Sequence, residues 1–245
     1  MKKWISGSFA LTLLFANVNA QKHTYIGVEG ALTNDVYEVI DKGPQLKNIP
    51  LLTSYFGLNI RQDLSTTVFA ETGLLRKFYD EGIGFKAFPG YTSGNAINAW
   101  LIPFRLGTRI NLHKRKTYLV PIIGYTLGIN SDYGYGDGGI GGHEINSKDT
   151  IHHTDHSKLS LRRTFPLLQT GIGVEWMLFR NAVLSLSANY YTGFTNVIEQ
   201  DISYTHNSTS YTATGLSKGE IMSFGMAVRY PVSKLWSSNK DKHHR

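Results

Sequence analysis

Ionised side chains recur at alternate positions of strand-like runs in this sequence. Alternate residues of an extended strand share one face, so these groups point to the same side of the strands that carry them. Guanidinium and carboxylate groups form strong two-pronged ion pairs. Such pairs would either fill an enclosed interior or, by switching partners, line a narrow gated path. The residues are Glu29, Arg61, Glu71, Arg105, Arg109, Glu175 and Arg229.

Histidines gather in the segment 131–164, after a glycine-rich run over 132–142. Imidazole and carboxylate groups at this density suit zinc or copper. The same residues fit a polar surface loop, because glycine-rich sequence costs conformational entropy to order. We expect no metal and no cofactor, and the ligands of the metal alternative would be His143, His152, His153 and His156.

A third set of reactive side chains lies near 204–210. If this segment is extended, His206 and Ser208 share a face, as a base and a nucleophile require, and Glu220 could orient the histidine. The His-x-Ser pattern resembles that of outer-membrane lipid A deacylases, which implies a lipid A-modifying hydrolase as an alternative. Thr209 stands where that family has Asn, and the polar flanks fit an exposed loop. We therefore expect no catalytic residues and no enzymatic activity.

The charged positions belong to about eight runs with a hydrophobic period of two. One face of each run is largely apolar, and the third run is the least regular because that face includes Thr66, Thr72 and Arg76. Pro103, Pro121 and Pro166 fall within runs, and we expect them near membrane boundaries, where a missing N–H is tolerated. The runs cover residues 24–32, 52–62, 66–78, 98–112, 117–130, 165–179, 182–194 and 220–230.

Short and long connections alternate between these runs, which is typical of outer-membrane barrels. The short ones are 62–65, 113–116 and 179–182, and the long ones are 33–51, 79–97, 131–164 and 195–219. We predict an all-β protein, an eight-stranded antiparallel transmembrane β-barrel with short periplasmic turns and long extracellular loops. Its location would be the outer membrane of a Gram-negative bacterium. A soluble barrel is the alternative, but it would bury its apolar face instead of its charged one.

Three segments divide the chain. A basic start, an apolar stretch over 9–15 and a small residue at Ala20 predict a signal peptide over 1–20. The barrel would occupy 21–230, followed by a periplasmic tail over 231–245. The formal net charge of +7 includes two signal-peptide lysines. The remaining excess is modest and accompanies no nucleic-acid motif, so we expect no nucleic-acid partner. The sequence has no cysteine, which excludes disulfides and thiolate chemistry.

Several stretches resemble the PorT-like and OmpA/OmpX-type small outer-membrane barrels of Gram-negative bacteria. They are Ile102-Pro103-Phe104-Arg105-Leu106-Gly107, Pro121-Ile122-Ile123-Gly124, the paired runs 168–178 and 183–194, and the closing 224–230. The resemblance implies a fold and a membrane, with links to secretion or adhesion in some members. The last run, ending at Tyr230, resembles their assembly signal, which implies recognition by the barrel-assembly machinery.

These observations favour a non-enzymatic outer-membrane barrel with a charged, plugged lumen. It would act through its extracellular loops or as an envelope scaffold in adhesion, secretion or envelope integrity. The expected partners are outer-membrane lipid and lipopolysaccharide, the assembly machinery, and an extracellular or periplasmic protein. The hydrolase and a narrow gated channel stay open as alternatives.

Overall fold

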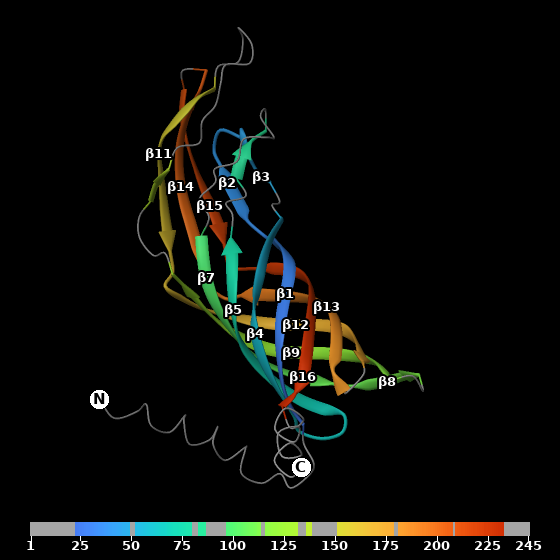
Figure 1. Ribbon diagram of the computed structural model, residues 1–245. Helices are drawn as coiled ribbons and strands as arrows, with labels where there is room; N and C mark the ends of the chain where they lie inside the picture. Colours follow the sequence, from blue (N-terminus) through green and yellow to red (C-terminus); the bar gives the residue numbers. More distant parts are fainter. Residues whose placement is uncertain are drawn as a thin grey trace, which may run out of the picture.

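The computed structural model describes residues 23–49, 52–79, 83–86, 97–113, 116–131, 136–138, 151–178, 181–207 and 209–232, without the side chains of 113, 136–138 and 151–159. The predicted signal peptide and, from residue 233 onward, the predicted tail lie outside this range. Eight long strands, one overlapping each predicted run, form a barrel (Figure 1). They are β1 (Thr24–Asp35), β4 (Leu52–Asp63), β5 (Val68–Tyr79), β7 (Ile97–Thr108), β9 (Thr117–Asn130), β12 (Thr164–Met177), β13 (Val183–Gly193) and β16 (Ile221–Pro231).

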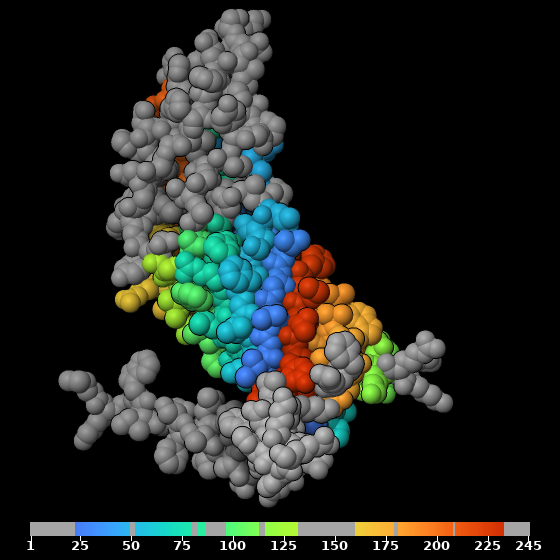
Figure 2. Space-filling model, in the orientation of Figure 1, coloured from blue at the N-terminus to red at the C-terminus, as the bar shows by residue number. Residues whose placement is uncertain are grey.

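Every neighbouring pair of these strands is antiparallel, and the sheet closes on itself. The last strand, β16, pairs with the first along its length, from Tyr25 opposite Pro231 to Asp35 opposite Ile221. Strand β12 pairs with both β13 and β9, which completes the circle. Figure 2 shows β4, β1 and β16 as adjacent cyan, blue and red bands of the outer wall. Closure satisfies the backbone hydrogen bonds within the wall, so the predicted eight-stranded barrel is confirmed.

The two faces of the wall have the polarity of a membrane barrel. Outward side chains such as Leu58, Leu106 and Ile123 are exposed, although they are apolar. Inward side chains such as Glu71 and Arg105 are buried, although they are charged. Because this arrangement suits lipid outside, the chain is an outer-membrane β-barrel, and the soluble-barrel alternative is wrong. No helix of the described residues is long and apolar enough to cross a membrane.

At one end of the barrel the strands are joined by the short segments 64–67, 109–116 and 178–182. The second of these segments contains the short strand β8 (Ile110–His113), which pairs with β9. The other end carries the long segments 36–51, 80–96, 131–163 and 194–220. In outer-membrane barrels the short turns face the periplasm, and the position of the long segments outside the cell stays a prediction.

Pro103 lies in the middle of β7, so our expectation that it would sit near a membrane boundary was wrong. The pairing of β5 with β7 has a gap here, between Thr72 opposite Phe104 and Leu75 opposite Leu101. Proline has no N–H to donate to a neighbouring strand, which accounts for the interruption.

The long segments contain further strands, which we call the extracellular lobe after the predicted orientation of the barrel. A five-stranded sheet has the order β10-β11-β14-β15-β2, and a two-stranded sheet pairs β3 with β6. In Figure 1 the larger sheet stands well beyond the end of the barrel at which β5 ends and β7 begins. The bounds are β2 (Glu38–Asp41), β3 (Leu46–Asn48), β6 (Ile83–Phe85), β10 (Gly136–Gly138), β11 (Ile151–Leu161), β14 (Ile198–His206) and β15 (Thr209–Ser217).

The extracellular lobe has its own apolar core. Phe85 of the small sheet is fully buried and meets the Tyr204 ring edge-on, with 5.6 Å between ring centroids. Tyr204 stacks on Tyr211 at the same distance. The buried core consists of Leu46, Ile83, Phe85, Ile202, Tyr204 and Ala213. The described strands of these outer segments are therefore held together by packing between two sheets, where the sequence pattern had indicated loops.

Candidate functional site in the barrel lumen

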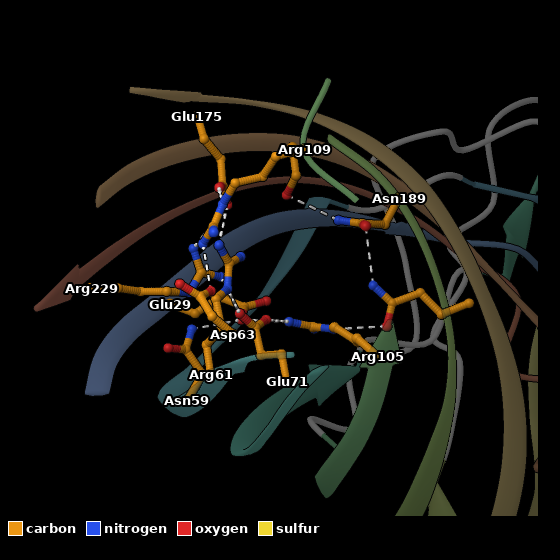
Figure 3. Close-up of polar contacts among 12 residues, drawn as sticks. Glu29, Asn59, Arg61, Asp63, Glu71, Arg105, Arg109, Glu175, Asn189 and Arg229 are labelled. Carbon is orange, nitrogen blue, oxygen red and sulfur yellow. Dashed lines mark hydrogen bonds and ion pairs between the residues drawn. The ribbon is translucent and has the colours of Figure 1, made fainter. Parts of the chain in front are cut away.

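The seven charged residues singled out from the sequence all lie inside the barrel. They come from strands around its circumference: β1, β4, β5, β7, β12 and β16, with Arg109 just after β7. Each is at most 7% exposed. Figure 3 shows their side chains pointing toward one another across the lumen. Strands far apart in sequence thus bring all seven into one cluster, which we call the charged layer.

Glu71 lies at the centre of the charged layer and contacts three arginines. One carboxylate oxygen, Oε2, accepts from Arg61 Nε at 3.0 Å and lies 2.8 Å from Arg229 Nη2. The other, Oε1, accepts from Arg105 Nη1 at 2.9 Å. Both oxygens are therefore occupied by guanidinium groups from three different strands.

Glu175 forms a second centre. Its Oε1 accepts from Arg61 Nη1 at 2.6 Å, and its Oε2 accepts from Arg109 Nε at 3.3 Å. Arg109 also lies 2.9 Å from Asp63, a residue that the sequence analysis did not single out. The Arg61 guanidinium sits 3.7 Å from the centroid of the Phe69 ring. Planar stacking of this kind suits arginine and holds the group in place.

Glu29 links the charged layer to neutral polar side chains. Its Oε2 accepts from Arg105 Nη1 at 2.6 Å and from Asn59 Nδ2 at 3.1 Å, and Tyr55 donates to Oε1. Arg105 also donates through Nε to Gln169 at 2.9 Å. Asn59 and Gln169 are both fully buried at inward positions of their strands.

Asp63, through its contact with Arg109, is an eighth member of the charged layer, and with it the charges of the layer balance. Glu29, Asp63, Glu71 and Glu175 face four arginines, and every arginine contacts at least one carboxylate. Removing charged groups from water costs several kcal/mol per ion, and only close partners offset that cost. A set of equal and opposite charges is therefore the composition that a closed interior tolerates. The arginines are Arg61, Arg105, Arg109 and Arg229.

A second, apolar layer fills the lumen toward the long-segment end. On β5, Leu75 follows Glu71 in that direction, and on β7, Leu101 precedes Arg105. Phe165 of β12 is fully buried in the same cluster, and Val197 and Ile198 reach it from the segment after β13. Its members are Ala31, Tyr37, Tyr55, Leu75, Tyr79, Ile97, Ala99, Leu101, Phe165, Leu167, Tyr191, Val197, Ile198 and Ile221.

One further ion pair lies near this end of the lumen. Lys77 Nζ, which is fully buried, donates to Asp35 Oδ2 at 2.8 Å. It also donates to the hydroxyls of Thr33 and Thr53 at 2.9 and 2.7 Å. The Tyr79 ring lies 4.3 Å from the ammonium group. Sequence alternation places Lys77 inward, but nothing in it identified Asp35 as its partner.

The structure does not assemble the hydrolase alternative. Ser208 lies outside the described residues. His206 pairs with Thr209 at the tip of the β14–β15 hairpin, whereas Ser217 pairs with Ile198 at its base and Glu220 follows beyond. Eight residue steps separate tip from base, or roughly 26 Å at about 3.3 Å per residue. Glu220 is thus too distant to orient His206. Because Ser208 is not described, the expected absence of catalytic residues stays a prediction.

The metal alternative falls largely outside the described part of the chain. His143 is not described, and His152, His153 and His156 lie in β11, whose side chains are described only from residue 160 onward. Among the residues that the structure does describe, no group of three or more His, Cys, Asp or Glu side chains is placed to hold a metal ion. The expected absence of a metal stays a prediction.

Neither a protein family nor a curated protein matches the sequence. Solved structures that align with it are outer-membrane proteins. OprG from Pseudomonas aeruginosa aligns over 85% of this chain and 96% of its own, at 12% identity and a TM-score of 0.45. Ail, the attachment invasion locus protein of Yersinia pestis, aligns over 86% and 100%, at 11% identity and a TM-score of 0.37. AlkL in DMPC bilayers aligns over 88% and 94%, at 10% identity and a TM-score of 0.35. Values this low transfer no function to this chain.

Proposed function

We propose that this protein is a non-enzymatic, non-conducting barrel that anchors the extracellular lobe at the cell surface, where the lobe binds a protein partner in adhesion, secretion or envelope integrity. One observation carries this proposal: the lumen holds a charged layer and an apolar layer in series, whereas the outer segments form a second folded unit. The resemblance to PorT-like barrels, and recognition of β16 by the barrel-assembly machinery, are parts of the same proposal.

The two layers argue against the channel alternative. A permeating ion would have to leave water and pass Leu75, Leu101 and Phe165, each at most 1% exposed. Moving an ion into such surroundings costs far more than the thermal energy unless the protein supplies a partner. Below this level, the guanidinium and carboxylate groups already bind one another, so an ion would also have to displace them. Conduction would need both layers to rearrange together.

The extracellular lobe offers what a binding protein needs, a stable surface with accessible polar groups. The face of β14 opposite the lobe core exposes Glu199, Asp201 and Ser203, and Thr212 lies exposed on β15. Because β14 and β15 pair over nine residues, this face is held by a continuous ladder of backbone hydrogen bonds. Rigid strands keep such groups in a fixed arrangement, which lowers the entropy cost of binding.

Single-channel recording tests the sealed lumen. We expect the refolded protein in a planar lipid bilayer to show no steady conductance. A Glu71→Gln variant should also be silent, because the apolar layer lies on a different level from the altered charge. Steady conductance that Glu71→Gln or Arg105→Gln changes would overturn the proposal and place the function inside the barrel.

A variant in the lobe core tests the role of the lobe. Replacing Phe85 by Ala removes a fully buried aromatic ring, which costs about 3–5 kcal/mol. We expect proteases to cut the lobe of this variant while the barrel stays protected by lipid. Ile40→Ala, at an exposed position of β2, is the matched control. Cells displaying each form would be compared for attachment to protein-coated surfaces and for leakage of periplasmic enzymes. Equal attachment and equal leakage for Phe85→Ala and wild type would contradict the proposal.

A further inference from the structure

Among the eight barrel strands, which the structure describes in full, the lipid-facing side carries one ionised side chain, Arg76 on β5. All other outward positions of the eight barrel strands are apolar, small, or polar without charge. The outward direction of Arg76 follows from its neighbours, because Leu75 and Lys77 are fully buried inside the barrel. A charge on the lipid face destabilises a barrel most at the midplane and least near the two interfaces. Its place on the wall therefore requires an explanation.

Arg76 lies near the outer edge of the apolar band. It stands eight residues above Val68, the first residue of β5, which follows the short periplasmic turn. For strands tilted by about 40°, eight residues rise roughly 20 Å, and the apolar band is about 25 Å tall. Only Phe78 lies further out on the same face of β5, and it stacks on Phe56 with 5.8 Å between ring centroids. Arg76 thus lies about 5 Å inside the outer edge of the band, and its long side chain lets the guanidinium reach the outer-leaflet headgroups.

Aromatic side chains surround Arg76, and no carboxylate does so among the described residues. Its Cζ lies 4.9 Å from the centroid of the Trp100 ring, and its register partners are Phe56 and Trp100. Every arginine of the charged layer, in contrast, contacts a carboxylate. A guanidinium has five N–H donors in a fixed fork that matches a phosphate. Arg76 is thus positioned by an aromatic ring, with donors available for an anion.

From this placement we propose that Arg76 and Trp100 form a binding site for a phosphate of lipopolysaccharide, the phosphorylated glycolipid of the outer leaflet. The guanidinium holds the phosphate, and Trp100 fixes the guanidinium while contacting the apolar part of the same lipid. Arg162 extends the site, since it is exposed and lies two residues before Thr164, which pairs with Ile129 beside Trp100. Three strand spacings, or about 14 Å, separate β5 from β12, so a second phosphate group lies within reach.

A binding measurement with defined lipids tests this site. The full protein, folded in uncharged detergent micelles, is titrated with lipid A and with the same lipid A after enzymatic removal of its phosphates. We expect the phosphorylated form to bind at least about tenfold more tightly, because hydrogen bonds to charged groups contribute about 1.5–3 kcal/mol. Arg76→Gln should abolish that preference, and Arg76→Lys should keep part of it. Lys42→Gln, which removes an exposed cation from the lobe, should leave it unchanged.

Equal affinity for the two lipids, or a preference that Arg76→Gln leaves intact, would overturn the proposal. Displacement of lipid A by an equal concentration of inorganic phosphate would also overturn it, since the site would then take the free anion. Conductance is measured independently of lipid binding, so this proposal can fail while the proposal of a sealed lumen holds.

Discussion

Neutralising Glu71 is the sharpest test of the charged layer. Its carboxylate, 2% exposed, contacts Arg61, Arg105 and Arg229 within 3.0 Å. In Glu71→Gln, Arg61 keeps Glu175 at 2.6 Å and Arg105 keeps Glu29 at 2.6 Å. Arg229 keeps only Glu175, at 3.8 Å. One buried guanidinium thus loses its close partner, and breaking a buried pair in this way costs about 3–5 kcal/mol.

Urea unfolding in lipid vesicles, followed by tryptophan fluorescence, measures this loss. Glu199→Gln is the matched control, because Glu199 is exposed on the lobe and its replacement should change the free energy of unfolding by less than about 0.5 kcal/mol. The double variant Glu71→Gln/Arg229→Met removes the stranded cation together with the anion. We expect it to be more stable than Glu71→Gln alone, with a coupling energy of about 1 kcal/mol or more. A Glu71→Gln barrel within 1 kcal/mol of wild type would refute the assignment of stability to these ion pairs.

Two further predictions concern the wall and the lobe. Leu58→Lys, on the lipid face at the middle of β4, should destabilise the barrel by roughly 2–4 kcal/mol, whereas Leu52→Lys at the outer end of the same strand should cost about 0–1 kcal/mol. Equal effects in vesicle unfolding would contradict the placement of the apolar band. Tyr204 donates to Asp41 Oδ1 at 2.7 Å, and burial together with this bond raises the pKa of Tyr204. The folded lobe therefore favours the neutral phenol. The contribution of Tyr204 to the stability of the lobe is fully present below the ordinary tyrosine pKa of about 10, and it falls as pH rises beyond that value. In limited proteolysis, cleavage of the lobe should increase above about pH 10, and it should increase less steeply with pH in Tyr204→Phe. An identical pH profile for both forms would count against the hydrogen bond.

The barrel could be predicted from sequence because one local rule, the alternation of faces, operates along every wall strand. The inward positions of Glu29, Arg61 and Glu175 followed from that rule. Their pairing did not, since Arg61 and Glu175 are 114 residues apart and meet only through the closure of the sheet. Asp63 was not identified from the sequence because it is the last residue of β4 and lies beyond the predicted run.

The apolar layer and the lobe were missed for different reasons. Leu75, Leu101 and Phe165 occupy inward positions, but an apolar residue facing inward looks the same in sequence whether it meets water or another side chain. The lobe strands β14 and β15 contain many Ser and Thr residues, which also suit exposed loops. Their order depends on packing of Phe85 and Leu46, from two other segments, against Tyr204. No local pattern reports a contact of that kind.

The balance of charge inside the barrel also determines how the protein responds to an electric field. A potential across a membrane acts on net charge, at about 2.3 kcal/mol per elementary charge for each 100 mV. The charged layer holds four anions and four cations, and Lys77 with Asp35 adds one of each. Paired groups that move together carry no net charge through the field, so voltage performs almost no work on them. The paired charges of the interior therefore do not respond to the membrane potential, and changes in that potential do not disturb the barrel that supports the lobe.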